Sequence, residues 1–398
     1  MQGLPPFQKS GISGVTLSRV RGFTKQRAKD AIARLAGEGH DLVAFWQASG
    51  EAIARAVPHW LSPCWFTLDP ASLLVTSHYS DGVLELPPEA LAHEYYGDDV
   101  NKLADVARSA RGISTLHEAT AGNPSRSPRW HENMALGGDQ EMIAALRTSG
   151  GQVWGAVGLY REPGQDLFDR EELAFVRAVA PHLAEGARRA LLLGEATDPD
   201  RPDAPGLLVL SETWEVESAT SCVGRWLADL PDGDWEAGRL PSSVVAVAGR
   251  ALRADEHPDE AGAATFSRVL SRSGVWVVLH GAALVSGASR RVAVIVEPAH
   301  PARIAPLLMS AYGLTEREQD VTRLVLQGHS TVEIAADLYV SPHTVQQHLK
   351  HVFDKTGVRS RRDLIGKIFF AHYEPRVRDN ERRALGDRPL RGGPVIPE

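Results

Sequence analysis

The sequence predicts a multidomain protein in which two α+β domains precede a small all-α domain of four helices. The chain of 398 residues is too long for one typical domain. Residues 26–194 and 206–299 each mix helical and strand patterns, whereas residues 306–373 contain helical patterns alone. Residues 195–205 read EATDPDRPDAP, an acidic and proline-rich composition that is typical of a linker. Residues 374–398 are charged and rich in proline and glycine, so we expect a disordered tail.

The first predicted domain opens with helical spacing over residues 27–57, which Gly37 and Gly39 divide into two helices. Apolar runs then predict several strands, and the tripeptide SGG between the last two of them is a hairpin signal. The predicted strands cover residues 64–69, 73–79, 141–148 and 153–162. A long helix over residues 170–193 closes the domain.

The run VWGAVGLYR, followed by F-D-x-E-E-L, ends this series of helices, strands, irregular middle and hairpin. The whole order resembles a GAF domain, an antiparallel sheet that cups a small ligand. That resemblance implies a pocket for a small-molecule effector, and aromatic side chains commonly line such pockets. The candidates are Trp65, Tyr79, Tyr95, Trp130 and Trp154, with Phe66 and Tyr96 beside them. Ordinary cores use the same residue types, so each of them could instead be a core side chain.

One face of the closing helix carries small and apolar residues at steps of three and four. This stripe consists of Leu173, Val176, Ala180, Leu183, Ala187 and Ala190. It could form a coiled-coil seam with a second copy of the chain, or it could pack on the sheet of its own domain. Pro181 interrupts the backbone hydrogen bonds of the helix and is expected to kink it near residue 177.

The second predicted domain begins with two short strands around a turn at residues 206–219. A helix over residues 221–230 follows, and strands at residues 275–285 and 291–298 end the domain. The residues between this helix and the last strands show no clear period, so we expect a loop-like middle. This order resembles a PAS domain. A short helix over residues 302–312 leads into the C-terminal domain, which is called the reader below.

Hydroxyl residues open the four helical patterns of the reader, namely Thr315, Ser330, Ser341 and Ser360. Acids three residues after the first two predict capping boxes, and Pro342 occupies the first helical position after the third. The spacing predicts helices over residues 331–338 and 342–356, with only residues 339–341 between them. So short a connection is the tight turn of a helix-turn-helix. A small core can be closed by Val321, Leu324, Ile334, Ala335, Leu338, Val340, Val345, Leu349 and Val352.

Six motifs of the reader read LTxRE, GxS, EIA, SxxTV, HL and KxGV between Leu314 and Val358. They resemble the DNA-binding domain of LuxR-type transcriptional regulators, which NarL-like response regulators share. The resemblance implies that the helix over residues 342–356 enters the major groove of double-stranded DNA. It also implies that a fourth helix, over residues 361–371, supplies a dimer contact. Many members have lysine where this chain has Gln346, so we expect a DNA site of its own.

By this resemblance Gln346, Gln347 and Lys350 face bases, in agreement with the chemistry of these side chains. Glutamine can bind adenine with two hydrogen bonds, and lysine can reach guanine or phosphate. The residues expected near phosphates are His343, Thr344, His351, Lys355 and Arg359. Lys355 could equally be a solvated cation that the helix dipole favours, and His348 is expected to be a packed histidine.

The charge of the chain is unevenly distributed, although its formal net value is −7. Residues 341–367 carry six Lys/Arg against two Asp/Glu, a local excess of +4. The rest of the chain carries 37 Lys/Arg against 48 Asp/Glu. A locally basic reader on an acidic body can contact phosphates while the body discourages indiscriminate DNA binding.

The sequence contains no metal-ligand spacing, nucleotide-binding loop or catalytic triad, so we expect neither enzymatic activity nor a cofactor. Cys64 and Cys222 are too few for a disulfide framework or a zinc module. Neither a membrane-spanning apolar run nor a signal-peptide pattern is found, which predicts a cytoplasmic protein. The predicted function is therefore a homodimeric transcriptional regulator that responds to a small molecule. A protein partner could replace that effector, or the front part could be an enzyme that the reader localises.

Overall fold

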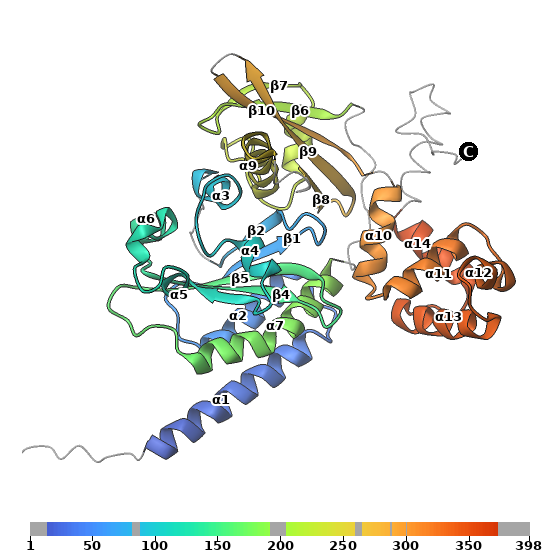
Figure 1. Ribbon diagram of the computed structural model, residues 1–398, viewed down its shortest axis with the longest axis horizontal. Helices are drawn as coiled ribbons and strands as arrows, with labels where there is room; N and C mark the ends of the chain where they lie inside the picture. The colour runs from blue at the N-terminus through green and yellow to red at the C-terminus, as the bar shows by residue number, and fades with distance from the viewer. Residues whose placement is uncertain are drawn as a thin grey trace, which may run out of the picture.

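The computed structural model describes residues 14–81, 88–191, 204–258, 265–286, 289–299 and 301–372, except for the side chains of residues 14–23, 285–289, 301–303 and 368–372. Two five-stranded antiparallel sheets with their helices precede a cluster of C-terminal helices (Figure 1). The predicted multidomain order, α+β before all-α, is therefore confirmed. The predicted tail, and the linker apart from Ala204 and Pro205, lie outside the described residues. Within the described ranges, no helix is long and apolar enough to cross a bilayer.

The first sheet has the strand order β2-β1-β5-β4-β3. Its strands are β1 (Cys64–Leu68), β2 (Val75–Tyr79), β3 (Ile113–Thr115), β4 (Gln140–Arg147) and β5 (Val153–Arg161). β4 and β5 form the predicted hairpin, in which Ala145 pairs with Ala156. The sequence predicts every strand of this sheet except β3, whose three residues are too few to show a period.

Three helices cover one face of the first sheet, as the lower part of Figure 1 shows. They are α1 (Gly14–Leu35), α2 (Leu42–Ala54) and α7 (Arg170–Ala190). Gly37 and Gly39 lie between α1 and α2, as predicted. Inside this layer the ring of Trp46 stacks on that of Trp65, with 4.4 Å between the ring centroids. The layer is a core of its own that lies between the sheet and the three helices.

The small and apolar stripe of α7 lies inside this core, where Val176, Leu183 and Ala187 are fully buried. α7 contacts α1 and α2 as well as β4 and β5. The helices approach so closely that a Cβ on Gly186 would lie 2.0 Å from Cζ of Phe45. Packing within the domain is thus the interpretation that the structure supports. All members of the stripe except the half-buried Ala190 are covered within the chain, so the structure does not support a coiled-coil seam along it.

The irregular middle that the sequence predicts contains several short helices on the opposite side of the first sheet. They are α3 (Pro88–Tyr95), α4 (Leu103–Arg108), α5 (Leu116–Ala119), the 3-10 helix η1 (Pro124–Arg126) and α6 (Pro128–Ala135). α4 packs on β4, whereas α6 has no buried residue. The part of this face near β1 and β2 packs against the second sheet and α9.

The second sheet has the order β7-β6-β10-β9-β8. Its strands are β6 (Gly206–Leu210), β7 (Val216–Ala219), β8 (Phe266–Leu270), β9 (Trp276–Ser286) and β10 (Ser289–Pro298). The predicted helix over residues 221–230 is the shorter α8 (Val223–Ala228). Four of the strands agree with the sequence prediction, and β8 does not appear in it.

The middle of this second unit is not loop-like, which corrects the sequence prediction. It contains β8 and the helix α9 (Ser242–Glu256). Every residue of α9 from Ser243 to Leu252 is buried. A helix that is covered all round has no polar face, so its sequence shows no alternation of apolar and polar residues at the helical period. The sequence of α9 therefore lacks the amphipathic pattern that predicts a helix.

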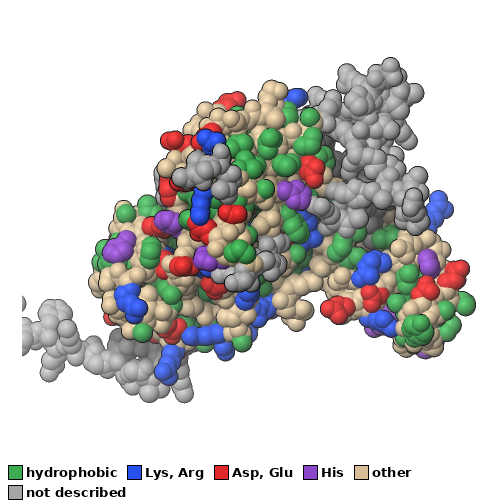
Figure 2. All heavy atoms as spheres, turned by 45° about the horizontal axis from the view of Figure 1, so that its top comes forward, with side chains coloured by type: hydrophobic (Ala, Val, Ile, Leu, Met, Phe, Trp, Pro, Cys, Tyr) green, Lys and Arg blue, Asp and Glu red, His purple; other side chains and the backbone are tan. Residues whose placement is uncertain are grey.

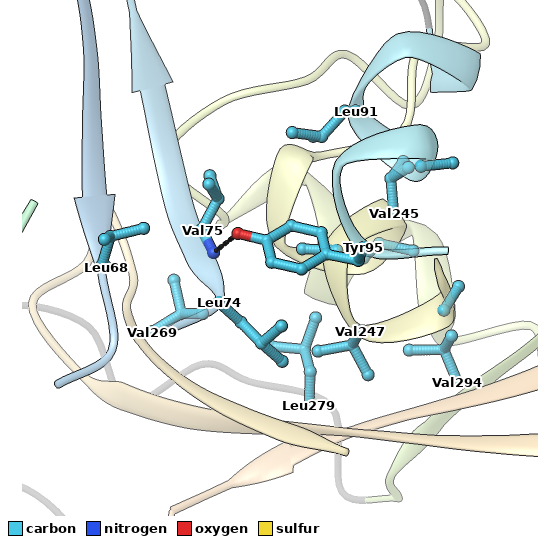
Figure 3. Close-up of a cluster of buried hydrophobic side chains, with 14 of the residues drawn as sticks. Leu68, Leu74, Val75, Leu91, Tyr95, Val245, Val247, Val269, Leu279 and Val294 are labelled. Carbon is cyan, nitrogen blue, oxygen red and sulfur yellow. Dashed lines mark hydrogen bonds between the residues drawn. The ribbon is translucent and has the colours of Figure 1, made fainter. Parts of the chain in front are cut away.

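One hydrophobic core joins the two sheets, and Figure 3 shows its centre. From the first unit come Leu68, Leu74, Val75, Leu91 and Tyr95, and from the second come Val245, Val247, Val269, Leu279 and Val294. The backbone N–H of Val75 donates to the Tyr95 hydroxyl at 2.8 Å. α3 and α9 pack so closely that a Cβ on Gly249 would lie 3.1 Å from the carbonyl oxygen of Ala92. The two α+β units are therefore one fused body, which is called the sensory module below after the role that we propose for it.

A buried ion pair crosses the same joint. Nε of Arg268 on β8 donates to a carboxylate oxygen of Asp69 at 2.9 Å, and so does the backbone N–H of Arg268. Asp69 follows β1 and is 0% exposed in its side chain, and Arg268 is 9% exposed. On the far side of the joint, the hydroxyl of Tyr96 donates to Glu256 at 2.8 Å. Polar partners thus fix the register of the two units where the apolar contacts alone would let them slide.

The helix α10 (Pro301–Ala311) connects the sensory module to the reader and has two buried faces. Ile304, Leu307 and Leu308 pack on Trp154 of β5 and Trp276 of β9. On its other face, Met309 belongs to the core of the reader. A guanidinium nitrogen of Arg188 in α7 also donates to the carbonyl of Ala311. α10 is therefore in contact with both units of the module and with the reader.

The outer face of the second sheet is turned away from α9 and is partly open. Leu207, Leu284 and Ile295 lie there and are each roughly two-fifths exposed. Ile295 pairs with Leu207 on one side and with His280 on the other, so the open side chains form adjacent rows. Figure 2 shows hydrophobic side chains gathered on the upper part of the molecule.

Candidate nucleic-acid interface

The reader has the four predicted helices, and each begins at its predicted cap. They are α11 (Glu316–Leu326), α12 (Thr331–Asp337), α13 (Pro342–Thr356) and α14 (Arg361–His372). Thr315 and Ser330 form complete capping boxes with Glu318 and Glu333. The Ser341 hydroxyl accepts the Thr344 N–H at 3.0 Å, which fixes the start of α13. The beginning of α13 is thus determined by one side chain immediately before it.

The core of the reader is the one that the sequence predicts. Val321, Ile334, Ala335, Val345, Leu349 and Val352 are buried, and Leu324, Leu338 and Val340 pack against them. Met309 of α10, Leu314, Val325 of α11 and Leu364 of α14 also belong to the cluster. These contacts hold α13 on the other helices by the side that carries Val345, Leu349 and Val352.

The opposite side of α13 carries the residues that were expected to contact DNA. His343, Gln346, Gln347, Lys350, His351 and Lys355 are all exposed. Their spacing of three and four residues places them on one continuous face of a helix. Figure 1 shows α13 along the lower edge of the reader, with neither sheet beside it. An α-helix with one free polar face of this kind fits the width of a major groove.

Three of the expected contact residues near the start of α13 have partners within the chain. Thr344 is half-buried, and its hydroxyl lies 2.9 Å from that of Ser341. The Gln347 amide nitrogen and His343 Nε2 are 3.2 Å apart, so these side chains are ordered on the surface of the helix. His348 is half-buried, as expected for a packed histidine.

Lys355 lies at the end of α13 and binds Glu318, the acid of the first capping box. Its Nζ donates to Glu318 Oε2 at 2.6 Å, and His351 Nδ1 lies 3.8 Å from the other oxygen. Burial opposes ionisation of Glu318, but hydrogen bonds from Lys355 and the Thr315 N–H outweigh it and lower the pKa of this carboxyl. The ammonium group of Lys355 is thus engaged within the protein, where it ties α13 to α11.

Further cations surround the junction of α13 and α14. A groove there is lined by residues that include Arg359, Arg362 and Lys367. Arg359 and Arg362 are exposed, whereas Lys367 donates to the carbonyl of Thr356 at 2.7 Å. Arg361 is turned inward and donates to the His329 carbonyl at 2.8 Å. Two of the cations in this region are therefore available to phosphates, and two hold the helices together.

The structure does not bring the five aromatic pocket candidates together. Trp65 lies under α2, Tyr95 lies in the joint core, and Trp154 lies against α10. Trp130 is on α6 and donates its indole N–H to Asp139 at 2.8 Å, while Tyr79 packs at the edge of the first core. Successive residues of a strand point to opposite faces, so neighbours in sequence are separated by the sheet.

The first unit has instead a small cavity between its sheet and α3 and α6, of about 50 Å³. Among its lining residues are Phe66, Glu94, Arg129, Glu141 and Tyr160. Arg129 forms ion pairs with Glu94 and, at 3.4 Å, with Glu141. Burial raises the pKa of Glu94, although the charge of Arg129 works against that rise. Burial likewise raises the pKa of the Tyr160 hydroxyl well above its ordinary value.

This polar cavity was missed by the sequence prediction, because its lining residues come from several elements, among them β1, α3, α6, β4 and β5, and share no motif. The sidechain carboxylates of Glu94 and Glu141 are nearly fully buried. Glu141 also accepts from Asn101 at 2.7 Å and from Asn133 at 3.0 Å. Among the described residues, no group of three or more His, Cys, Asp or Glu side chains is placed to hold a metal ion.

Comparison with known proteins agrees with the geometry of the reader. Residues 313–367 match the family model described as bacterial regulatory proteins, luxR family. A protein of Mycobacterium bovis named as an HTH-type transcriptional regulator is 54% identical over 52 residues, and so is one of Mycobacterium tuberculosis. This match covers 13% of the chain and only 6% of those relatives.

Solved structures that match the chain as a whole are too distant to support an argument. The E. coli DhaR(N)-DhaL complex has a TM-score of 0.21 at 13% identity, covering 74% of this chain and 92% of that chain. A bacteriophytochrome of R. palustris has a TM-score of 0.24 at 13% identity, covering 74% of this chain and 64% of that one.

The spore germination protein GerE of Bacillus subtilis is a relative that this chain matches over most of its length. It is 38% identical over 55 residues, which are 14% of this chain and 74% of that protein. The chain therefore belongs to the luxR family of bacterial regulatory proteins, and its reader carries that membership.

Proposed function

We propose that the protein is a sequence-specific DNA-binding transcriptional regulator whose reader is controlled by the sensory module. The observation that carries this proposal is the exposed face of α13, on which Gln346, Gln347 and Lys350 lie together. It belongs to a luxR-family domain, and the relatives from Mycobacterium are named as transcriptional regulators. Non-enzymatic control of transcription follows from this assignment.

On DNA, α13 lies in the major groove with its three central polar side chains on base edges. Glutamine binds N6 and N7 of adenine, and lysine binds guanine or a phosphate. His343, His351 and Arg359 lie on the flanks of that face and contact the backbone. Gln346 contributes no charge, so hydrogen bonds to bases carry more of the recognition at this position than attraction to phosphate does.

Control by the sensory module operates through α10, because this helix is buried against the module and the reader at once. Two copies of the chain place two α13 helices about one helical turn apart on an inverted repeat. An effector shifts the population towards the pairing geometry in which both helices fit the duplex. Packed interfaces of this kind switch between discrete arrangements, which allows a small change in the module to reach the reader.

The effector site is the polar cavity of the first unit. A cavity of about 50 Å³ holds a few water molecules, so a small molecule enters when α6 moves outward. α6 has no buried residue, so its outward movement exposes little apolar core, but it separates Arg129 from Glu94 and Glu141, and the ligand then takes the place of Arg129 on these carboxylates. Glu94 and Glu141 accept hydrogen bonds, which favours a ligand with donor groups or a positive charge.

Selection of bound duplexes from random DNA, followed by binding titrations, tests the DNA-binding proposal. Lys350→Ala and Gln346→Ala are expected to reduce discrimination between selected and scrambled sites by about 1–3 kcal/mol. Arg323→Ala is the matched control, because it removes one exposed cation from α11 and leaves α13 intact. Discrimination that is unchanged in both α13 variants would remove the base-contact assignment.

A separate screen tests the effector site. Thermal shifts of the full chain are measured against a library of small amines and amino acids, for the natural protein and for Glu141→Gln. A ligand of the cavity is expected to raise the melting temperature of the natural protein and to lose most of that effect in the variant. Equal shifts in both proteins would place the effector elsewhere.

A further inference from the structure

Tyr339 lies in the turn between α12 and α13, directly after the C-cap residue Leu338, and is 95% exposed. Its φ is +54°, in the left-handed region that residues with a Cβ rarely adopt. Neither fact is explained by packing, because so exposed a side chain contributes almost nothing to the core of the reader. A bulky residue in an unfavourable backbone conformation at a surface turn indicates a functional role, because nothing in the packing stabilises it there.

The turn is a Schellman motif that ends α12. The N–H of Val340 donates to the Ala335 carbonyl at 3.0 Å, and the N–H of Tyr339 donates to that of Ala336 at 3.2 Å. In this motif the residue in the left-handed region is usually glycine. The turn is also fixed from the side, since Arg317 donates to the carbonyl of Leu338 at 2.6 Å. Tyr339 thus points outward from a rigid support.

The other helices of this region provide an internal comparison. α10, α11 and α13 are followed by Gly313, Gly328 and Gly357, which all have positive φ. Each of these ends has the same type of backbone hydrogen bond, for example from His329 N–H to the Leu324 carbonyl at 3.0 Å. Glycine therefore stands at three of the four comparable positions. The exception is the turn that leads into the helix with the exposed polar face.

We propose that Tyr339 is a contact to the DNA backbone, in which its hydroxyl donates to a phosphate oxygen and its ring packs on the adjoining deoxyribose. This inference rests on the proposed function. Tyrosine hydroxyls are regular phosphate partners in protein–DNA complexes. Tyr339 lies two positions before Ser341, the cap of α13. It is therefore close to the N-terminus of α13, where His343 is the first residue of the exposed polar face. The contact holds the N-terminus of α13 at a fixed depth in the groove.

The test compares Tyr339→Gly and Tyr339→Phe with the natural full-length chain on a selected duplex and on a scrambled one. The glycine variant is expected to bind both duplexes about tenfold more weakly, and the phenylalanine variant about fivefold. The ratio between the two duplexes stays the same, because a backbone contact carries no sequence information. The salt dependence of binding also stays the same, because tyrosine releases no counterion.

Stability separates this role from a structural one. Tyr339→Gly suits the left-handed backbone and is expected to raise the melting temperature of the reader while it weakens binding. Gly328→Ala is the matched control at the end of α11: it lowers stability, and DNA affinity measured below its melting temperature stays as in the natural protein. A glycine variant at position 339 that binds as tightly as the natural chain would overturn the inference, and so would weaker binding to the selected duplex alone. If the natural chain itself selects no duplex, the proposed function is what fails.

Discussion

The reader and the sensory module differ in where the information for their structure lies along the chain. In the reader, four hydroxyl caps open four helices, and each cap contacts a residue three positions away. In the module, the joint core combines strands and helices that are far apart in sequence, such as Leu68 with Val269. The first kind of structure can be seen in a short window of sequence, whereas the second cannot.

The difference also concerns how the two regions respond to change. The reader presents its working face to solvent and keeps only a small core. In the module, the ion pair of Asp69 with Arg268 and the largely buried helix α9 both lie at the joint of the two units, which share one continuous core. Because α9 is packed against α3 and β2 of the first unit, a change at this contact involves both units. The proline-rich linker predicted between them does not make them independent, since an interface this apolar prevents free motion.

The largest effect is expected at the ion pair of the joint. Asp69→Ala removes the carboxylate that pairs with the buried guanidinium of Arg268, and it should destabilise the module by about 3–5 kcal/mol. Chemical denaturation followed by tryptophan fluorescence measures this loss. Hydrogen exchange of the α13 amides should remain unchanged, since the reader has a core of its own.

The double variant Asp69→Asn, Arg268→Met is the control for this prediction. It removes both charges but keeps an amide oxygen that can accept the backbone N–H of residue 268, so it should recover part of the stability that the single variant loses. A single variant in which the two α+β units unfold in separate transitions, with only one of them shifted, would show that the joint core is not cooperative.

The next effect depends on pH and arises from His78 in β2. Burial lowers the pKa of this imidazole from 6.5 to about 4, and its ring lies 4.9 Å from that of Phe66. As the pH falls, the unfolded chain takes up this proton before the folded chain does. The contribution of His78 to the free energy of unfolding is therefore complete above the pKa of the unfolded imidazole, and it is lost as the pH falls towards the pKa of the folded one. By pH 5 the loss should be about 2 kcal/mol.

Denaturation midpoints between pH 7 and pH 4.5 test this dependence. His78→Leu should flatten the decline, because leucine takes up no proton. Glu94 works in the opposite direction, since its raised pKa favours the folded state as the carboxyl becomes protonated. An unchanged slope in the His78 variant would assign the acid sensitivity to other groups.

A smaller and local effect is expected in the reader. Ser330→Ala removes the hydroxyl that accepts the Glu333 N–H at 3.3 Å, and it should cost the reader about 1 kcal/mol. Ser330→Asn, which can cap as well, should retain most of the stability. Exchange rates in α12 should rise, while those in β1 and β5 stay the same. Faster exchange in the sheets would mean that the reader and the module unfold as one unit.

The sequence predicts the fold of the reader more completely than that of the module, because the signals for the reader lie in short stretches of the chain. All four helices of the reader and its nine core residues agree with prediction, because caps and helical spacing are local signals. Most strands of the module agree as well. α9 and the joint core do not, because a helix covered on every side shows no period and the packing of one sheet on another leaves no local mark.

For the candidate sites the same distinction holds. The exposed face of α13 follows from the spacing of Gln346, Lys350 and their neighbours. The polar cavity could not be predicted, since Glu94, Arg129 and Glu141 are brought together only by the tertiary fold. Tyr339 has a signal in the sequence, a large residue at the end of a helix where glycine is usual, but its meaning depends on the observed φ.

The smallest effect is expected at Lys355, a residue of the reader whose partner in the structure differs from the one that the sequence pattern predicts. Lys355 was expected near phosphate, yet its ammonium binds Glu318 at 2.6 Å, whereas Arg359 is exposed. If Lys355 is occupied within the protein, Lys355→Met should leave the salt dependence of DNA binding nearly unchanged. Arg359→Met should reduce the slope of log affinity against log salt by about 0.9, the value for one phosphate contact. The lysine variant should lose at most about 1 kcal/mol of stability, because its ion pair is partly exposed. Equal changes of slope in the two variants would mean that Lys355 leaves Glu318 when DNA binds, and that the sequence pattern described the bound state better than the free structure does.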